Sequence, residues 1–143
     1  MAVRSDGEWL AINEAVIAEF RANGGQCGGA FAGNPMVLLT TTGARTGLAR
    51  TSPVTYTTDG DRIVLIASKA GADHHPAWYH NLVANPRVTV EVGTERFEAD
   101  ARVAAEPERS RLFDARVAVM PRFGGYREQT DREIPVVVLE RLG

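Results

Sequence analysis

Residues 5–24 carry the hydrophobic pattern of one amphipathic helix. Ser5 and Glu8 stand three residues apart at its start, the spacing of a capping box. Asn23-Gly24 supplies a stop signal. Between them the apolar positions recur at helical spacing, namely Trp9, Ile12, Val16 and Phe20.

After residue 35 the pattern changes to short runs of β-branched and other apolar residues, bounded by turn residues. Glycine-containing turns at Gly43–Gly47, Asp59–Asp61 and Gly93-Thr94 predict hairpins, which join antiparallel strands. The runs predict six strands: Met36–Thr42, Thr51–Thr57, Arg62–Ser68, Val88–Val92, Phe97–Val103 and Ile134–Leu139.

Two further helices interrupt the strand pattern. Pro76–Ala84 joins the third and fourth predicted strands. Pro107 marks the start of a second helix from Glu108 to about Met120, with Leu112, Arg116 and Val119 along one side. A doubly wound sheet would need helices between most strands, so we expect a mainly β, α+β fold: an antiparallel barrel with an N-terminal helix and two inserted helices. We expect one domain, with the helix and its glycine-rich connection in residues 1–33 and the barrel in residues 34–143.

Composition narrows the classes of partner and compartment. The formal net charge is -2 and the charges are interspersed, which argues against a nucleic-acid partner. Cys27 is the only cysteine, so an internal disulfide is excluded and a reducing cytoplasm is expected. No apolar run reaches the roughly 18 to 20 residues of a membrane span. We therefore expect a protein that is soluble or at most peripheral at the inner face of the membrane.

Residues that could bind a metal or act as a nucleophile form no convincing set. The spacing of His74, His75 and His80 fits no common metal site. Cys27 lies in the glycine-rich connection with no base beside it in the sequence. We expect no bound metal.

The turn at Gly43–Gly47 carries candidate chemistry. Glycine exposes backbone N–H groups there, and Arg45 and Arg50 add two guanidinium groups, which together suit a phosphate or a carboxylate. An ordinary hairpin with solvated arginines explains the turn equally well.

A second candidate anion site follows the third predicted strand. Ser68 and Lys69 lead there into the flexible stretch Ala70-Gly71-Ala72. Lys69 is the only lysine among 16 basic residues, and the bias toward arginine indicates a GC-rich genome. A compact ammonium is not interchangeable with a guanidinium at a crowded phosphate, although a surface lysine is the simpler alternative.

Taken in order, these stretches resemble the deazaflavin-dependent nitroreductase and quinone reductase family, from about Asn34 to Leu139. The shared motifs are a threonine-rich strand into Gly43-Ala44-Arg45-Thr46-Gly47 and Arg50, then Ser68–Ala72, Pro76-Ala77-Trp78-Tyr79-His80-Asn81-Leu82, Asn85-Pro86 and Thr130-Asp131-Arg132-Glu133-Ile134-Pro135. The resemblance implies a split β-barrel like that of flavin mononucleotide oxidases. It also implies coenzyme F-420 as the hydride donor.

The resemblance implies roles for individual residues. Arg45, Arg50 and Lys69 would bind the phosphate and oligoglutamate tail, with Thr46 and Gly47 in the same turn. The deazaflavin ring or its linker would meet Pro53, Val54, Ser68, Ala70, Gly71 and Ala72. Trp78 and Asn81 match the family motif too. We expect Trp78, four residues before Leu82, to be in the core and Asn81 to be a loop or cap hydrogen bonder.

The acceptor side is expected in a loop after the second inserted helix, with Met120, Phe123 and Tyr126 as an apolar wall. Trp9 and Phe20 could close it. Tyr126, Ser68 or water would supply the proton when a hydride passes to a flat quinone-like or nitroaromatic acceptor. A flavin mononucleotide-dependent reductase and a non-catalytic coenzyme carrier are alternatives, and the protein is expected to be a monomer or a homodimer.

Overall fold

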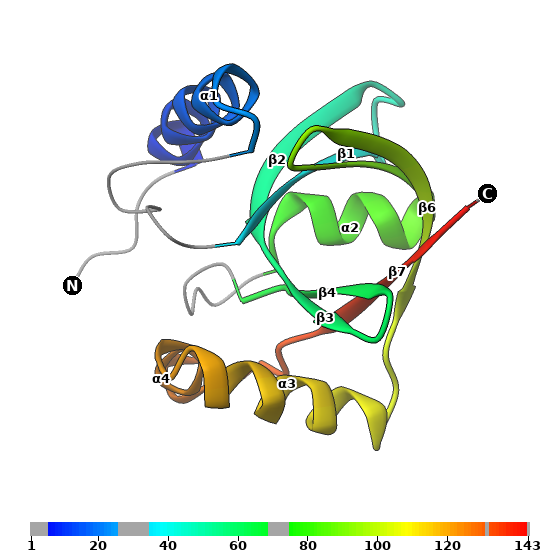
Figure 1. The fold of residues 1–143 in the computed structure, drawn as a ribbon. Helices are drawn as coiled ribbons and strands as arrows, with labels where there is room; N and C mark the ends of the chain where they lie inside the picture. The colour runs from blue at the N-terminus through cyan, green and yellow to red at the C-terminus, as the bar shows by residue number, and fades with distance from the viewer. Residues whose placement is uncertain (1–5, 26–34, 69–74, 131, 143) are drawn as a thin grey trace.

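The structure is a computed structural model that describes residues 6–25, 35–68, 75–130 and 132–142, except the side chains of residues 6–12 and 122. Its strands form one sheet in the order β2-β1-β5-β6-β7-β4-β3, in which all neighbours are antiparallel. The strands are β1 (Met36–Thr42), β2 (Ala49–Thr55), β3 (Thr57–Asp59), β4 (Arg62–Ile66), β5 (Arg87–Val92), β6 (Glu95–Val103) and β7 (Val136–Arg141). The expected antiparallel barrel is confirmed (Figure 1).

The barrel closes at Tyr56, the single residue between β2 and β3. These two strands are the two ends of the sheet order, so the chain passes from one sheet edge to the other at this corner. The Tyr56 backbone N–H donates to the Pro35 carbonyl at 3.2 Å, and the Tyr56 carbonyl accepts from Arg116 Nη1 at 2.9 Å. The expected single strand Thr51–Thr57 was wrong here, because the bend needed for closure interrupts the ladder.

Four helices surround or fill the barrel in the described part of the chain. They are α1 (Asp6–Ala22), α2 (Ala77–Ala84), α3 (Glu108–Val119) and α4 (Arg122–Gln129). The first three confirm the expected helices to within a residue or two, although Ser5 of the expected capping box lies outside the described residues. The fourth was missed: its Arg122-Phe123-Gly124-Gly125 start carries two glycines, each costing about 1 kcal/mol in a helix interior.

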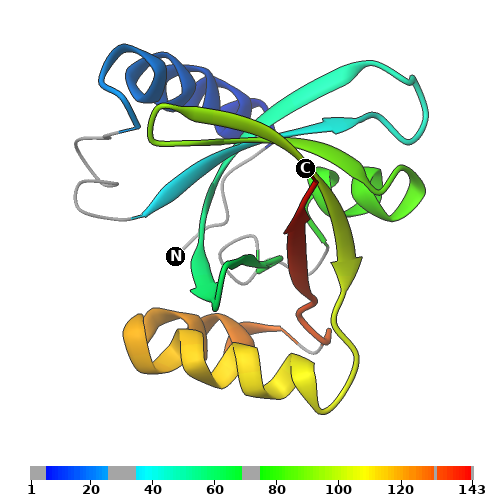
Figure 2. The same ribbon diagram turned by 45° about the vertical axis from the view of Figure 1, so that its right-hand side comes forward.

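Helix α1 packs on the outer face of β1 and β2, on the opposite side of the barrel from α3 and α4 (Figures 1 and 2). Val16 and Phe20 are buried against Met36 and Leu38. Burying a side chain of this size contributes roughly 1.5 to 3 kcal/mol. Phe20 is only 2% exposed, so the expectation that it closes the acceptor side is wrong.

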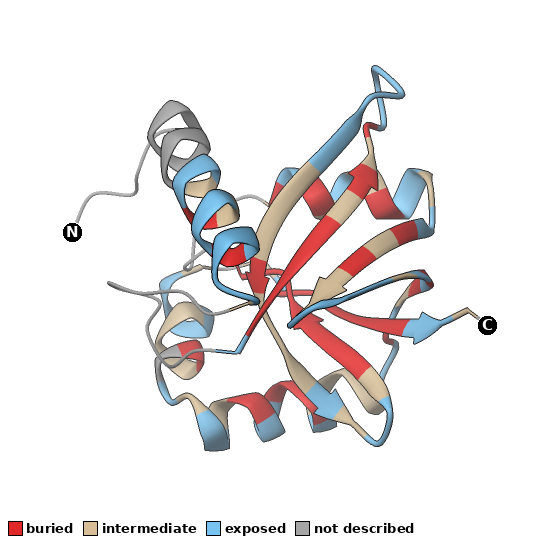
Figure 3. Ribbon diagram, turned by 45° about the horizontal axis from the view of Figure 1, so that its top comes forward, coloured by how far each residue is buried: buried red, intermediate tan, exposed pale blue. Residues whose placement is uncertain are grey.

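The barrel interior holds the main hydrophobic core. Helix α2 lies at one end of the barrel, where Figure 1 shows it framed by the strands. Its Trp78 and Leu82 are buried among inward-facing strand residues, which confirms the expectation for this pair. Figure 3 shows the distribution of burial: buried positions lie along the strands, and exposed positions lie on the outward faces of the helices.

A second core lies between α3, α4 and the outer face of β4 and β7. Leu112 and Phe113 of α3 pack there against Phe123 of α4 and Val138 of β7. Val119 is 69% exposed, so the expected apolar side of α3 is wrong at its end. Val117, in the same last turn, packs against the cluster instead. No helix in the described ranges is both long and apolar enough to cross a membrane.

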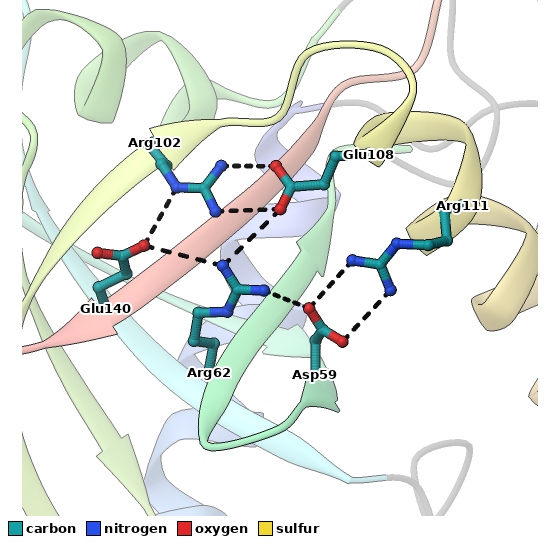
Figure 4. A network of polar contacts seen from close by, with 6 residues as sticks. All are labelled: Asp59, Arg62, Arg102, Glu108, Arg111 and Glu140. Atoms are coloured by element: carbon teal, nitrogen blue, oxygen red, sulfur yellow. Dashed lines mark hydrogen bonds and ion pairs between the residues drawn. The ribbon is translucent and has the colours of Figure 1, made fainter.

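A network of ion pairs fastens the start of α3 to the sheet (Figure 4). Arg102 of β6 makes a bidentate contact with Glu108, at 2.6 and 3.1 Å, and a third contact with Glu140 at 3.2 Å. Arg111 of α3 contacts Asp59 at 3.2 Å, and Arg62 also pairs with Asp59. The Arg111 and Arg62 hydrogen bonds hold the pKa of Asp59 below its ordinary value, and the Arg102 hydrogen bonds do the same for the pKa of Glu108.

We expect Glu108→Gln to lower the stability of the protein at pH 7 and to lower it less at pH 3. A carboxyl whose pKa is lower in the folded state stabilises the fold above the unfolded pKa of about 4 and loses that effect as the pH falls through the folded pKa. Urea midpoints of both proteins at the two pH values measure this difference. Glu128→Gln is the control, since Glu128 is an exposed helical carboxylate without an ion pair among the described residues. Equal midpoints of the Glu108 variant and wild type at pH 7 would contradict the prediction.

Candidate functional site

The turn between β1 and β2 has a tight backbone that requires glycine at residue 43. Gly43 N–H donates to Leu48 O at 2.8 Å, and Gly47 N–H donates to Gly43 O at 2.9 Å. A Cβ at residue 43 would lie 2.7 Å from Thr46 Oγ1, so no other residue fits without movement. Thr46 Oγ1 accepts from Leu48 N–H at 3.2 Å. The turn therefore has a defined shape, with Thr46 occupied in maintaining it.

Helix α2 anchors this turn from the barrel end. Asn81 accepts a hydrogen bond from Ala44 N–H at 3.0 Å and donates one to Thr41 Oγ1 at 3.1 Å. Asn85, the residue after α2, donates to Thr42 O at 3.4 Å. The expectation that Asn81 is a loop hydrogen bonder is confirmed by these contacts. Its amide holds the turn, in which the backbone N–H groups of Gly43, Ala44, Gly47 and Leu48 all have partners.

Arg45 and Arg50 are the exposed cations of this turn. Within the described ranges neither guanidinium makes an ion pair or a hydrogen bond. Most of the other described arginines pair with a carboxylate, as Arg21 does with Glu91 at 3.0 Å. Two unpaired guanidinium groups beside a rigid glycine turn form a donor set for an anion with several charges.

On β2, Pro53 and Val54 point to opposite faces of the sheet. Pro53 pairs with Leu38 across the ladder and is partly exposed on the outer face. Val54 pairs with Val37, is 8% exposed and belongs to the interior core. Only the backbone of Val54 could therefore contact a bound molecule. Pro53 remains a prediction for a side-chain contact.

Ser68 lies just beyond the end of β4, which contacts β2 near the place where the two sheet ends meet. Ser68 is buried, and its carbonyl accepts a hydrogen bond from Arg132 Nη2 at 2.6 Å. The predicted residues Lys69, Ala70, Gly71 and Ala72 lie outside the described residues. The structure thus places the start of this predicted site next to Arg132, a motif residue for which no role was predicted.

The predicted acceptor side is a helix and not a loop. Phe123 and Tyr126 are one turn apart on α4. Their ring centroids are 5.2 Å apart, and the rings pack edge to face. Phe123 is 4% exposed and part of the outer core, whereas Met120 and Tyr126 are partly buried against it. Phe123 therefore supports Tyr126 from behind, and only Met120 and Tyr126 offer surface. The side chain of Trp9 lies outside the described ones.

Sequence reasoning missed the arginine that joins two of the predicted stretches. Arg132 Nη1 lies 2.8 Å from His75 Nδ1, and the same guanidinium contacts Ala67 and Ser68. The motif Thr130–Pro135 was the available signal, but nothing in its spacing showed which side chain faces the end of β4. Among the described residues, no three His, Cys, Asp or Glu side chains lie close enough together to bind a metal ion.

Comparison with known proteins identifies the family. The family model described as F420H(2)-dependent quinone reductase matches residues 13–141. An F420H(2)-dependent quinone reductase of Mycobacterium tuberculosis is 40% identical over 136 residues, which cover 92% of this chain and 89% of that protein.

Two solved structures agree in fold. One, described as an F420-H2 dependent reductase, is 37% identical with a TM-score of 0.68 and covers 74% of this chain and 94% of its own. Another, described as a domain-swapped dimer, is 33% identical with a TM-score of 0.70. The match covers 95% of this chain and 100% of the other chain. The expected split β-barrel with α+β composition is thereby confirmed. This chain belongs to the F420H(2)-dependent quinone reductase family.

Proposed function

We propose that this protein reduces a quinone-type acceptor with a hydride from reduced coenzyme F-420, bound where β2 and the end of β4 meet. One observation supports the location: Arg45 and Arg50 have no ion pair with any described residue and lie beside a glycine turn that Asn81 holds in shape. A long polyanionic tail needs such donors. Bound there, the coenzyme would supply a two-electron hydride donor, which is the step that side chains alone cannot perform.

The residues present fit this coenzyme. Arg45 and Arg50 would bind the phosphate and carboxylate groups of the tail, with the backbone N–H groups of Arg45 and Thr46 beside them. Pro53 on β2 and Ser68 after β4 would hold the ring region from its two sides. Trp78 contributes indirectly, because it fills the core under α2 and fixes the helix that carries Asn81.

For the acceptor, Met120 and Tyr126 would form one apolar wall that stacks a flat ring and keeps water out. The hydroxyl of Tyr126 is the proton donor we propose, with Ser68 as the alternative. Ser68 is the less accessible of the two, since it is 6% exposed. Proton transfer from a positioned side chain contributes about 100-fold to 10,000-fold in general.

The binding arm of the test is a fluorescence titration with coenzyme F-420 and with flavin mononucleotide. We expect tighter binding of coenzyme F-420, because its longer anionic tail reaches both arginines. Equal or tighter binding of flavin mononucleotide would reject the proposal in favour of a flavin enzyme on the same barrel.

The acceptor arm mixes the protein and reduced coenzyme with a soluble quinone analogue and, separately, with a bicyclic nitroimidazole. We expect faster turnover of the quinone, because a wall with one hydroxyl favours an apolar ring over a nitro group that needs several donors. Robust nitroimidazole reduction with negligible quinone turnover would contradict this. Background turnover with every acceptor, together with tight coenzyme binding, would indicate a carrier.

A homodimer is the assembly we propose, because the relative described as a domain-swapped dimer covers nearly the whole chain. Light scattering of the purified protein measures the mass directly. A mass of one chain would reject this part of the proposal without affecting the rest.

A further inference from the structure

Arg132 contacts three acceptors, at two separate points of the chain, through one planar guanidinium group. Its Nη2 donates to Ser68 O at 2.6 Å, and its Nη1 donates to Ala67 O at 3.2 Å. Nη1 also lies 2.8 Å from His75 Nδ1. Ala67 and Ser68 immediately precede residues 69–74, and His75 immediately follows them. The guanidinium therefore ties together both ends of this segment.

The contact with His75 fixes the state of the imidazole. A guanidinium has donors only, so Nδ1 must accept and the ring proton must sit on Nε2. The His75 ring also faces α2, with its centroid 4.7 Å from that of Tyr79 and 5.7 Å from that of His80. His75 is thus held between Arg132 on one side and these two rings on the other.

Arg132 is itself held by its neighbours in the Thr130–Pro135 motif. Its backbone N–H donates to Thr130 Oγ1 at 3.3 Å. Ile134 is buried in the outer core, and Pro135 O accepts from Ala67 N–H at 2.9 Å, which extends the ladder between β4 and β7. The backbone on the carboxyl side of Arg132 is therefore tied to the outer core and to the end of β4.

We propose that Arg132 is a positioning residue that sets Ser68 and His75 in the arrangement needed for coenzyme binding. The inference rests on the proposed function for the identity of the ligand, but the contacts of Arg132 with Ser68 and His75 lie within the protein itself. A planar fork reaches three acceptors at once, whereas a lysine ammonium on a flexible stem does not reproduce that arrangement.

The first test measures coenzyme F-420 binding by fluorescence for Arg132→Lys and Arg132→Gln. We expect both to raise the Kd about tenfold or more, because Ser68 and His75 lose the guanidinium that holds them in place. Arg141→Lys and Arg141→Gln are the control variants, because the Arg141 guanidinium also contacts an oxygen acceptor and a ring, those of Glu95 and Phe97, but lies on β7. A wild-type Kd in Arg132→Lys would overturn the proposal, since a positive charge at residue 132 would then be enough for coenzyme binding. Circular dichroism melting confirms that each variant folds.

The second test needs no coenzyme. The ¹⁵N shifts of the His75 ring, assigned by their loss in His75→Asn, should show an Nε2-protonated neutral ring near pH 7.5 in wild type and a mixture of tautomers in Arg132→Lys. An unchanged tautomer in the variant would overturn the proposed role of Arg132. If the tautomer changes but wild type does not bind coenzyme F-420, Arg132 still positions His75 and the proposed function fails.

The pH dependence of coenzyme binding is a third measurement, and it tests the contact between Arg132 and His75. Protonation of His75 at Nδ1 removes the acceptor and places a cation against Arg132, so coenzyme affinity should fall once the pH is low enough for the ring to take up a proton. In His75→Asn the Oδ1 atom replaces Nδ1 as an acceptor that does not protonate, so the fall should be smaller than in wild type. His80→Asn is the control. Parallel profiles for wild type and His75→Asn would overturn the role of this contact.

Discussion

Replacing both Arg45 and Arg50 with alanine is expected to raise the Kd for coenzyme F-420 between about tenfold and a hundredfold. Exposed charge contacts are worth roughly 1 kcal/mol each, and two of them correspond to about 30-fold. The effect should appear in binding and leave the fold intact, because both side chains are exposed and unpaired among the described residues. Fluorescence titration and thermal melting measure the two quantities.

The salt dependence of coenzyme binding shows whether Arg45 and Arg50 act through their charge or whether their replacement only disturbs the local structure. The wild-type Kd should rise with sodium chloride, since exposed charges are screened over about 8 Å at physiological ionic strength. The double variant should show a much flatter dependence. Arg96→Ala is the matched control: Arg96 is also exposed and without an ion pair in the described ranges, but it lies on β6, three strands from β2 in the sheet.

Three outcomes would count against the arginine site. The first is unchanged affinity in the double variant, and the second is an equal loss in Arg96→Ala. The third is an undiminished salt dependence, which would place the tail contacts elsewhere, with Lys69 the first residue to examine. Asn81 provides the link between site and fold, because its amide holds the backbone from which Arg45 extends.

The parts of the fold that the sequence predicted well have strong local signals. Glycine turns at residues 43–47, 60 and 93 mark the hairpins, and Gly47, Gly60 and Gly93 all adopt positive φ. The helical spacing of Trp78 and Leu82 likewise indicated a buried pair. In each case the information lies within a few residues of the chain.

The features that the sequence did not predict depend on contacts between distant residues. The corner at Tyr56 exists because the two sheet edges must meet, which no run of seven residues reveals. Helix α4 forms despite two glycines because Phe123 and Tyr126 gain burial against α3 and β4. The roles of Arg132 and Arg116 follow from partners that are about 60 residues away in sequence.

The same reasoning explains which site residues could be anticipated. Arginines beside a glycine turn indicate an anion from composition alone, whatever the fold. The residues that hold the turn and the end of β4 in place act through backbone carbonyls and amides, and backbone groups carry no sequence signal. The role of Arg132 was therefore not predictable from the sequence, whereas the anion-binding role of Arg45 and Arg50 was inferred from it and stays a prediction.

Arg116 is expected to be the most sensitive charged residue for stability. It is 2% exposed on α3, donates to the Tyr56 carbonyl at the barrel corner, and its guanidinium lies 4.9 Å from the centre of the Phe123 ring. Arg116→Ala removes a charged donor, worth about 1.5 to 3 kcal/mol, and leaves a cavity in the outer core. We expect a loss of roughly 3 kcal/mol, or about 10 °C in Tm for a domain of this size.

Arg116→Met separates the hydrogen bond from the packing, because methionine keeps most of the apolar stem and contacts Phe123. A buried charge can often be replaced by an apolar residue of similar size at little cost, so we expect a smaller loss of about 1 to 2 kcal/mol. Arg127→Met is the matched control: Arg127 also lies 4.9 Å from a phenylalanine ring, that of Phe113, but is exposed, and its loss should stay within about 0.5 kcal/mol. Urea unfolding of the three variants measures these differences, and wild-type stability in Arg116→Ala would show that the corner at Tyr56 closes without the guanidinium.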